Sequence, residues 1–316
     1  MLCAVSACGI LMGSVKLNFS QLLDGFTKHD SIYRIIIYDM RLPRVIGAAL
    51  CGAALACSGL ALQCVTANDL CAPNIIGINS GAGFFVIVVL AFIPRLWRLL
   101  PFFAFCGALF TAFAVIAISN SVRNRSGSVL VLSGVAVSSV FNAAISFCSL
   151  KYPDILSSYT AFSVGGFSSV SYDDITIPGI IIVISLFALQ FISPKLSLLY
   201  LGDDIASSLG VRVRYVRTLT IVISAALCAS AVSFAGLLGF VGLIVPHIVR
   251  KIMGEDMRFN VSLTAICGAV LVIFSDLAGR VIFSPTELPA GIIMSLVGAP
   301  FFLFILIARG KKNDRM

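Results

Sequence analysis

Nine long runs of this 316-residue chain contain no Asp, Glu, Lys or Arg, and they limit what it can fold into more than any other feature. An α-helix needs roughly 20 apolar residues to cross the 30 Å hydrocarbon core of a bilayer. The runs have about that length, and they predict an all-α integral membrane protein. They cover residues 1–15, 45–68, 70–94, 99–122, 126–150, 175–194, 218–249, 259–275 and 288–308.

The composition excludes the other broad classes. Hydrophobic residues make up 59% of the chain and charged residues 11%, whereas soluble domains carry roughly 25% charged residues. The net charge of +8 indicates membrane orientation rather than nucleic-acid binding, because loops on the cytoplasmic side are rich in Lys and Arg. The ten cysteines stand singly, with no CxxC pair, so we expect no metal and no cofactor on this chain.

The run 218–249 is too long for one span, because 32 residues would form a helix of about 48 Å. It contains three glycines and Pro246, so we predict two helices, from about residue 217 to 235 and from about 240 to 253. The total is then ten spans in a single domain, 1–316. An even number places both termini on one side, and the distribution of Lys and Arg favours the cytoplasmic side.

An internal repeat suggests how the spans are arranged. Residues 48–60 align with 225–237 at an offset of 177, with seven of thirteen positions identical. A duplication would give halves of about 1–174 and 175–316, each with five spans. An odd number of spans inverts the second half, and inverted repeats are typical of transporters.

Three features suggest chemistry or coupling. An intramembrane serine hydrolase would have to use Ser80 and His247. A stand-alone ion-coupled transporter would have to use Asp276, the only acid well inside a span; Asp276 either pairs with Arg280 four residues later or leaves Arg280 to face outward. In the loop 195–216, Asp203 and Asp204 are placed to start a short helix on the cytoplasmic face that would suit docking.

Five segments in order resemble the permease subunits of ABC importers for iron–siderophore complexes, haem and cobalamin. They are RLPRVIGAALCGAALACSGLALQ (41–63), PNIIGINSGAG (73–83), LGDDIASSLGVRVRYVR (201–217), GLLGFVGLIVPHIVRKIMG (236–254) and SDLAGRVIFSPTELPAGIIMSLVGAPFFLFIL (275–306). The resemblance implies a ten-helix permease in the cytoplasmic membrane of a prokaryote, paired with a second copy or a homologous permease.

The resemblance also implies the partners and the cargo. Two cytoplasmic ATPase subunits would bind ATP and Mg, so the permease itself would not be an enzyme. An extracellular or periplasmic binding protein would deliver an iron chelate, a ferric siderophore foremost, with haem or cobalamin as alternatives. The rival interpretation is the stand-alone ion-coupled secondary transporter.

The resemblance assigns three groups of site residues, and one position departs from the family pattern. The family's N-P-L-A motif reads Asn68-Asp69-Leu70-Cys71 here, so an aspartate replaces the proline. The implied groups are outward-facing Arg41, Arg44 and Arg280 for binding-protein docking; Gly202, Asp203, Ala206, Leu209 and Gly210 for ATPase docking; and Asn68, Leu70 and Ser128 for the cytoplasmic gate.

Overall fold

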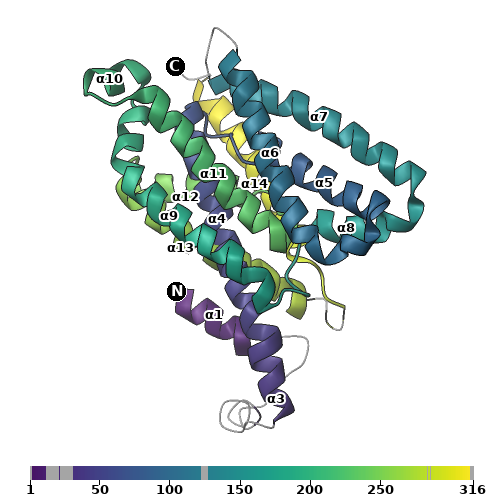
Figure 1. Ribbon diagram of the computed structural model, residues 1–316. Coiled ribbons are helices and arrows are strands. Elements are labelled where there is room, and N and C mark those ends of the chain that lie inside the picture. Colours follow the sequence, from purple (N-terminus) through teal and green to yellow (C-terminus); the bar gives the residue numbers. More distant parts are fainter. Residues whose placement is uncertain are drawn as a thin grey trace.

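The computed structural model describes residues 2–11, 21, 31–121, 127–282, 284 and 286–313. Helices make up all the regular secondary structure of these residues (Figure 1). The elements are α1 (Leu2–Leu11), α3 (Ile32–Ile35), η1 (Ile36–Arg41), α4 (Leu42–Thr66), α5 (Ile78–Phe92), η2 (Pro94–Leu99), α6 (Leu100–Ser121), α7 (Gly127–Lys151), η3 (Pro153–Ile155), α8 (Leu156–Val164), α9 (Tyr172–Tyr200), α10 (Asp203–Ser208), α11 (Val213–Ala235), α12 (Val241–Met253), α13 (Met257–Val281) and α14 (Ala290–Asn313).

Six of the described helical segments are long and apolar enough to cross a membrane, which fits the predicted multi-pass protein. Three shorter apolar helices, Leu2–Leu11, Ile78–Phe92 and Ala290–Ile305, accompany them. The six segments are Ile32–Thr66, Pro94–Ser119, Val129–Lys151, Tyr172–Tyr200, Val213–Ala235 and Met257–Val281.

The predicted division of the run 218–249 is confirmed. Helix α11 ends at Ala235 and α12 begins at Val241. The turn between them contains two residues with positive φ, Gly236 at 73° and Phe240 at 64°. Both conformations interrupt a right-handed helix, so the chain changes direction here.

Other boundaries differ from the sequence-based expectation because charged residues lie inside helices. The helix that contains α4 begins at Ile32, so Arg41 and Arg44 are helical and do not lie in a loop. Helix α13 likewise continues past Asp276 to Val281. In the other direction, the run 70–94 is helical only from Ile78, after a loop that ends at Gly77 with a φ of 87°.

Helix α4 lies at the centre of the bundle and packs against α9, α11, α12 and α13. Two of its glycines permit close approach of the backbones. A Cβ atom on Gly52 would lie 2.2 Å from the carbonyl oxygen of Gly268 in α13, and one on Gly59 would lie 2.0 Å from that of Gly242 in α12. Small residues therefore let helices of the core pack backbone to backbone, as membrane helices commonly do.

Helices α4 and α11 run antiparallel through the core. The hydroxyl groups of Ser58 and Ser224 lie 2.7 Å apart near the middle of the pair. Thr66 at the end of α4 and Arg217 near the start of α11 line one cavity together with α10. We call this end of the bundle the α10 end. The opposite end, where α4 begins (Figure 1), we call the arginine end, because Arg44 lies in the first turn of α4 and Arg280 in the last turn of α13.

We predict that Gly52→Ala disrupts stable folding, because its Cβ atom would overlap the backbone of α13. Gly47→Ala in the same helix is the matched control, since a Cβ atom there would meet its nearest neighbours at an ordinary 3.4 Å. Size-exclusion chromatography of the detergent-solubilised variants measures the outcome. Equal monodisperse yields for the two variants would contradict the close contact.

Candidate functional site

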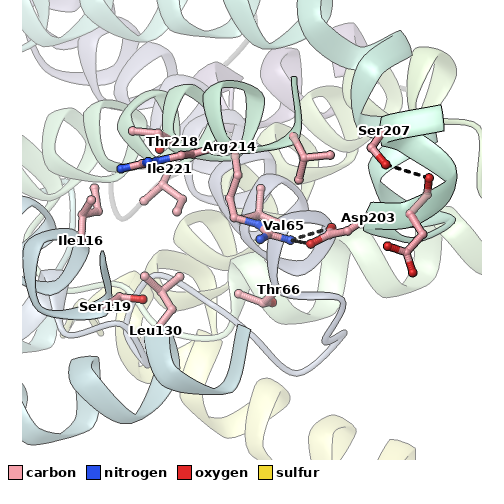
Figure 2. Close-up of a pocket in the computed structure, with 13 residues that line it drawn as sticks. Val65, Thr66, Ile116, Ser119, Leu130, Asp203, Ser207, Arg214, Thr218 and Ile221 are labelled. Carbon is pink, nitrogen blue, oxygen red and sulfur yellow. Dashed lines mark hydrogen bonds and ion pairs between the residues drawn. The ribbon is translucent and has the colours of Figure 1, made fainter. Parts of the chain in front are cut away.

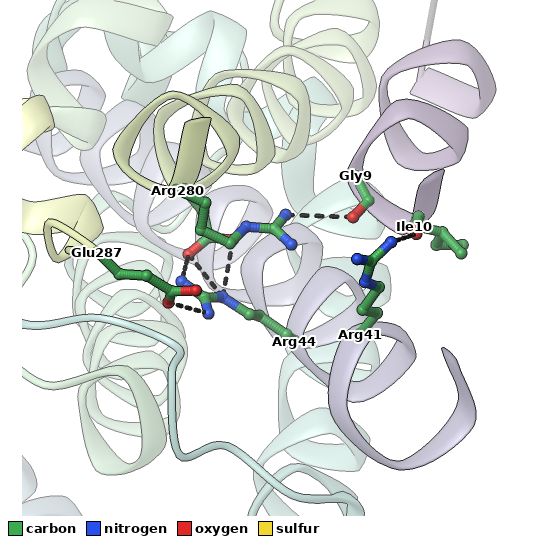
Figure 3. Close-up of polar contacts among 7 residues, drawn as sticks. Gly9, Ile10, Arg41, Arg44, Arg280 and Glu287 are labelled. Atoms are coloured by element: carbon green, nitrogen blue, oxygen red, sulfur yellow. Dashed lines mark hydrogen bonds and ion pairs between the residues drawn. The ribbon is translucent and has the colours of Figure 1, made fainter. Parts of the chain in front are cut away.

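At the arginine end, Arg44, Arg280 and Asp276 form a buried cluster, with the partly exposed Glu287 and the buried Arg41 beside it (Figure 3). Arg44 binds Asp276 with its Nε and Nη2 atoms at 2.9–3.0 Å and donates from Nη1 to Glu287 at 2.7 Å. Arg280 pairs with the same Asp276 at 3.1 Å, one helical turn away. Asp276 therefore balances two guanidinium groups, and its exposed fraction is only 1%.

The last turn of α1 covers this cluster. Arg41 donates to the main-chain oxygens of Ile10 and Leu11 at 2.7 and 3.0 Å, and Arg280 donates to that of Gly9 at 3.2 Å. A helix C-terminus carries unsatisfied carbonyl groups and a partial negative charge, so cationic donors suit it. The arginines thus cap α1 as well as pairing with acids.

The three arginines differ from the outward-facing side chains implied by the family resemblance. Their exposed fractions are 6% for Arg41, 9% for Arg44 and 2% for Arg280. Of the two alternatives for Asp276, the structure shows the pairing with Arg280. The contribution of Glu287, with its side chain 29% exposed, was not foreseen, because nothing in the sequence links it to Arg44 at a distance of 243 residues.

At the α10 end, the short helix predicted after Asp203 is present. Gly202 and Gly210 flank it with φ values of 119° and 81°, which only glycine adopts readily. Ala206 within α10 is fully buried, and Asp203 pairs with Arg217 of α11 at 2.8 Å. Helix α10 is therefore attached to the bundle by one small side chain and one ion pair.

Helix α10 and the residues at its two ends carry exposed apolar side chains that sequence reasoning recognised only in part. Leu201, Ile205 and Leu209 are 57%, 48% and 60% exposed. Ile205 lies within α10, Leu201 precedes Gly202 at the end of α9, and Leu209 is the C-cap residue of α10. We call these three residues the apolar stripe; their regular spacing is visible in the sequence, but only Leu209 was among the expected docking residues.

A cavity of about 340 Å³ separates α10 from the ends of the neighbouring helices (Figure 2). Val65 and Thr66 of α4, Leu130 of α7 and Ile221 of α11 form its apolar side. Asp203 of α10 and Arg214 of α11 bring charge to it. This space lies between α10 and the ends of α4, α7 and α11, next to the buried Ala206.

The loop after α4 also lies at the α10 end and holds the expected gate residues. Ala67 ends α4 in the left-handed conformation with a φ of 47°, and the Asn68 side chain accepts a hydrogen bond from the Leu70 backbone at 3.0 Å. Leu70 lines a small cavity with His247 of α12 and Phe301 of α14. Ser128 lies in the first turn of α7, and its side chain is outside the described residues.

The hydrolase interpretation finds no support in the described chain. His247 lies against the ring of Phe301, with centroids 6.4 Å apart, and lines cavities at the α10 end. Ser80 lies in α5 and is not among the residues that line these cavities. A nucleophile and its base would need to lie within hydrogen-bonding reach.

Comparison with known proteins places these features in a family, since the family model described as the FecCD transport family matches residues 1–308. The chain belongs to the FecCD transport family. It is 32% identical to the Fe(3+)-citrate import system permease protein YfmE of Bacillus subtilis, over 99% of this chain and 94% of that protein. It is 33% identical to the "Probable heme-iron transport system permease protein IsdF" of Staphylococcus aureus, with the same coverage.

Two further relatives agree with this family membership. The iron(3+)-hydroxamate import system permease protein FhuB of Bacillus subtilis is 37% identical over 85% of this chain and 71% of that protein. A solved structure described as an inward-facing conformation of a metal-chelate type ABC transporter superposes with a TM-score of 0.86 and 28% identity, over 97% of this chain and 96% of that one. These FecCD relatives are permease subunits, and the ATPase of such importers is a separate subunit.

We predict that Asp276→Asn destabilises this FecCD permease strongly, by about 3–5 kcal/mol, because it leaves two buried arginines without their shared counter-charge. Asp203→Asn is the control, since it breaks an Asp–Arg pair that is half exposed and worth about 1 kcal/mol or less. Thermal unfolding of the detergent-purified variants measures the difference. Equal losses of stability in the two variants would show that burial does not determine how much an ion pair contributes to the free energy of unfolding.

Proposed function

We propose that this chain is the membrane permease of an ATP-driven importer that carries an iron chelate across the cytoplasmic membrane. The observation that carries the proposal is the end-to-end match to permeases whose names specify iron citrate and haem iron. A ferric siderophore is the proposed cargo, since a further relative is named for iron hydroxamate, with haem as the second candidate. Cobalamin, an alternative at the sequence level, has no support in these names.

We propose ten membrane crossings in two inverted halves. The crossings would be α1, α4, α5, α6 and α7 in the first half and α9, α11, α12, α13 and α14 in the second. The predicted repeat pairs residues 48–60 with 225–237, which lie in α4 and α11 up to the turn at Gly236. Their antiparallel course through the core supports an inverted relation between the halves.

The α10 end is the proposed cytoplasmic side. Loops and helix ends there carry a concentration of basic residues, which favours the cytoplasm. Both termini would face this side, although α1, with ten residues, starts in the half of the bundle nearer the arginine end (Figure 1). The basic residues are Arg212, Arg214, Arg217, Arg250 and Lys251.

Helix α10 is the proposed contact with the ATPase subunits. The apolar stripe is exposed at the end of the bundle, and burying it against a partner would be favourable. A push on α10 would reach α11 through the Asp203–Arg217 ion pair. The cavity beneath α10 leaves room for that displacement.

The arginine end is the proposed contact with the binding protein. Arg41 and Arg280 donate hydrogen bonds to main-chain oxygens of α1 in this structure. For these arginines to bind the partner, its carboxylates would have to replace those main-chain oxygens as acceptors. A charged carboxylate is a stronger acceptor for a guanidinium fork than a neutral carbonyl group. Arg44 would stay with Asp276 and position Glu287 at the surface.

The gate is proposed to be formed by Asn68, Leu70 and Ser128, together with the same residues of a second permease subunit. The position of Leu70 between α12 and α14 supports this role. A stand-alone ion-coupled transporter is less consistent with the structure. Asp276, its candidate coupling residue, is buried and paired with two arginines, which leaves it poorly placed to release and rebind ions.

The first test of the proposal is purification of the tagged chain from its native membrane in mild detergent, followed by uptake of radioactive iron into cells that express the full system. We expect an ATPase to copurify and uptake to require ATP. Ferric citrate, a ferric hydroxamate and haem, offered in parallel, separate the candidate cargoes. Active uptake by the chain alone, abolished by an uncoupler at constant ATP, would contradict the proposal.

A second test addresses the apolar stripe. We predict that Ile205→Asp lowers the amount of ATPase recovered with the permease at least tenfold, because it places a charge in the proposed contact. Ser208→Asp introduces the same charge on an exposed residue of the same helix outside the stripe and serves as the control. Quantitative mass spectrometry of the purified complex reads the ratio. Equal recovery with both variants would remove the stripe from the interface.

A further inference from the structure

The aspartate that replaces the family's proline has a specific partner. Asp69 pairs with Arg250 of α12 at 3.1 Å, and the two side chains are 18% and 8% exposed. The pair joins the loop 67–77 to a helix about 180 residues further along the chain. Proline, which has no charge, could not make this contact.

Arg250 is held from two other directions. It donates a hydrogen bond to the side-chain oxygen of Gln63, whose amide nitrogen in turn donates to the main-chain oxygen of Gly242 at 3.0 Å. Its guanidinium group also lies 5.9 Å from the centre of the Tyr200 ring, at the end of α9. The guanidinium group is therefore fixed in position, and Asp69 is the contact that ties the loop to it.

The ion pair stands at the edge of open space. Asp69 and Arg250 line a cavity of about 770 Å³ with His247 of α12 and Phe301 and Ile305 of α14. The next residue, Leu70, closes a separate small cavity between the same two helices. Movement of the loop away from α12 would join these spaces and open the α10 end of the bundle.

We infer that Asp69 and Arg250 form a latch that holds the loop 67–77 against α12, so that the cytoplasmic end opens only when the pair separates. This inference rests on the proposed function as an importer permease. Separation leaves Arg250 with Gln63 and Tyr200, so the arginine stays in place while the loop moves. The latch thus opposes leakage until the partner ATPase drives opening.

The reactivity of a native thiol on the loop 67–77, that of Cys71, can be used to measure whether the loop is closed. The Cys71 side chain is 1% exposed, and burial raises the pKa of its thiol to about 11, so it reacts slowly with maleimides while the loop is closed. Labelling is measured without ATP on the complex with its ATPase in nanodiscs, and ATP hydrolysis is measured in a separate assay of the same complex. Labelling of Cys71 is followed by mass spectrometry, which separates it from the exposed Cys3 and Cys267.

Asp69→Asn and Arg250→Gln should each raise the labelling rate of Cys71 at least fivefold and raise ATP hydrolysis in the absence of binding protein. The charge exchange Asp69→Arg with Arg250→Asp should return both values toward those of the parent. Glu255→Gln removes an acid that lines the same cavity outside the pair and should change neither.

Unchanged labelling in both single variants, or a charge exchange as reactive as the single variants, would overturn the latch. Measurements on the unmodified complex distinguish failure of the latch from failure of the proposed importer function. If the unmodified complex contains an ATPase and imports iron while the variants leave Cys71 protected, the proposed function stands and the latch fails. If no ATPase copurifies with the parent, the proposed function itself fails.

Discussion

Close backbone contact between α4 and its neighbours is the interaction on which the rest of the structure depends. Lipid is as apolar as the side chains, so helices in a bilayer associate through tight packing and internal hydrogen bonds. Gly52 against Gly268 and Gly59 against Gly242 bring α13 and α12 into direct contact with α4. The same contacts set the register that places Arg44 beside Asp276 and Gln63 beside Gly242.

Both charged clusters are attached to this one rigid helix. Arg44 lies in its first turn and Gln63 in its last, so α4 links the arginine end to the contact network of Arg250. Three segments at the ends of the bundle are held to it by polar contacts in addition to apolar packing. They are the last turn of α1, the loop 67–77 and α10. All three lie where the family's partners or gate are expected.

The helices could be predicted from sequence because exclusion of charge from the hydrocarbon core acts on each segment separately. The turn between α11 and α12 and the start of α10 were also predictable, because the effect of glycine and aspartate on backbone conformation is local in sequence. Partners distant in sequence were not predictable: Arg44 meets Glu287 across 243 residues, and Asp69 meets Arg250 only after the bundle forms. Burial of the arginines was missed because the family resemblance implied outward-facing side chains, and their contacts with α1 and Asp276 form only when the bundle folds.

The two ion pairs at the α10 end suit different tasks because their exposure differs. The Asp203–Arg217 pair, with side chains 51% and 28% exposed, can break and re-form in water with little change in free energy, which lets α10 move with a partner. The Asp69–Arg250 pair is largely shielded, with side chains 18% and 8% exposed, so separating it costs more free energy than separating an exposed pair. Arg250 keeps its contacts with Gln63 and Tyr200 after separation, so the arginine stays in place while the loop moves. A gate held by a shielded pair stays closed until it is driven open, whereas a coupling helix needs an ion pair that breaks and re-forms easily.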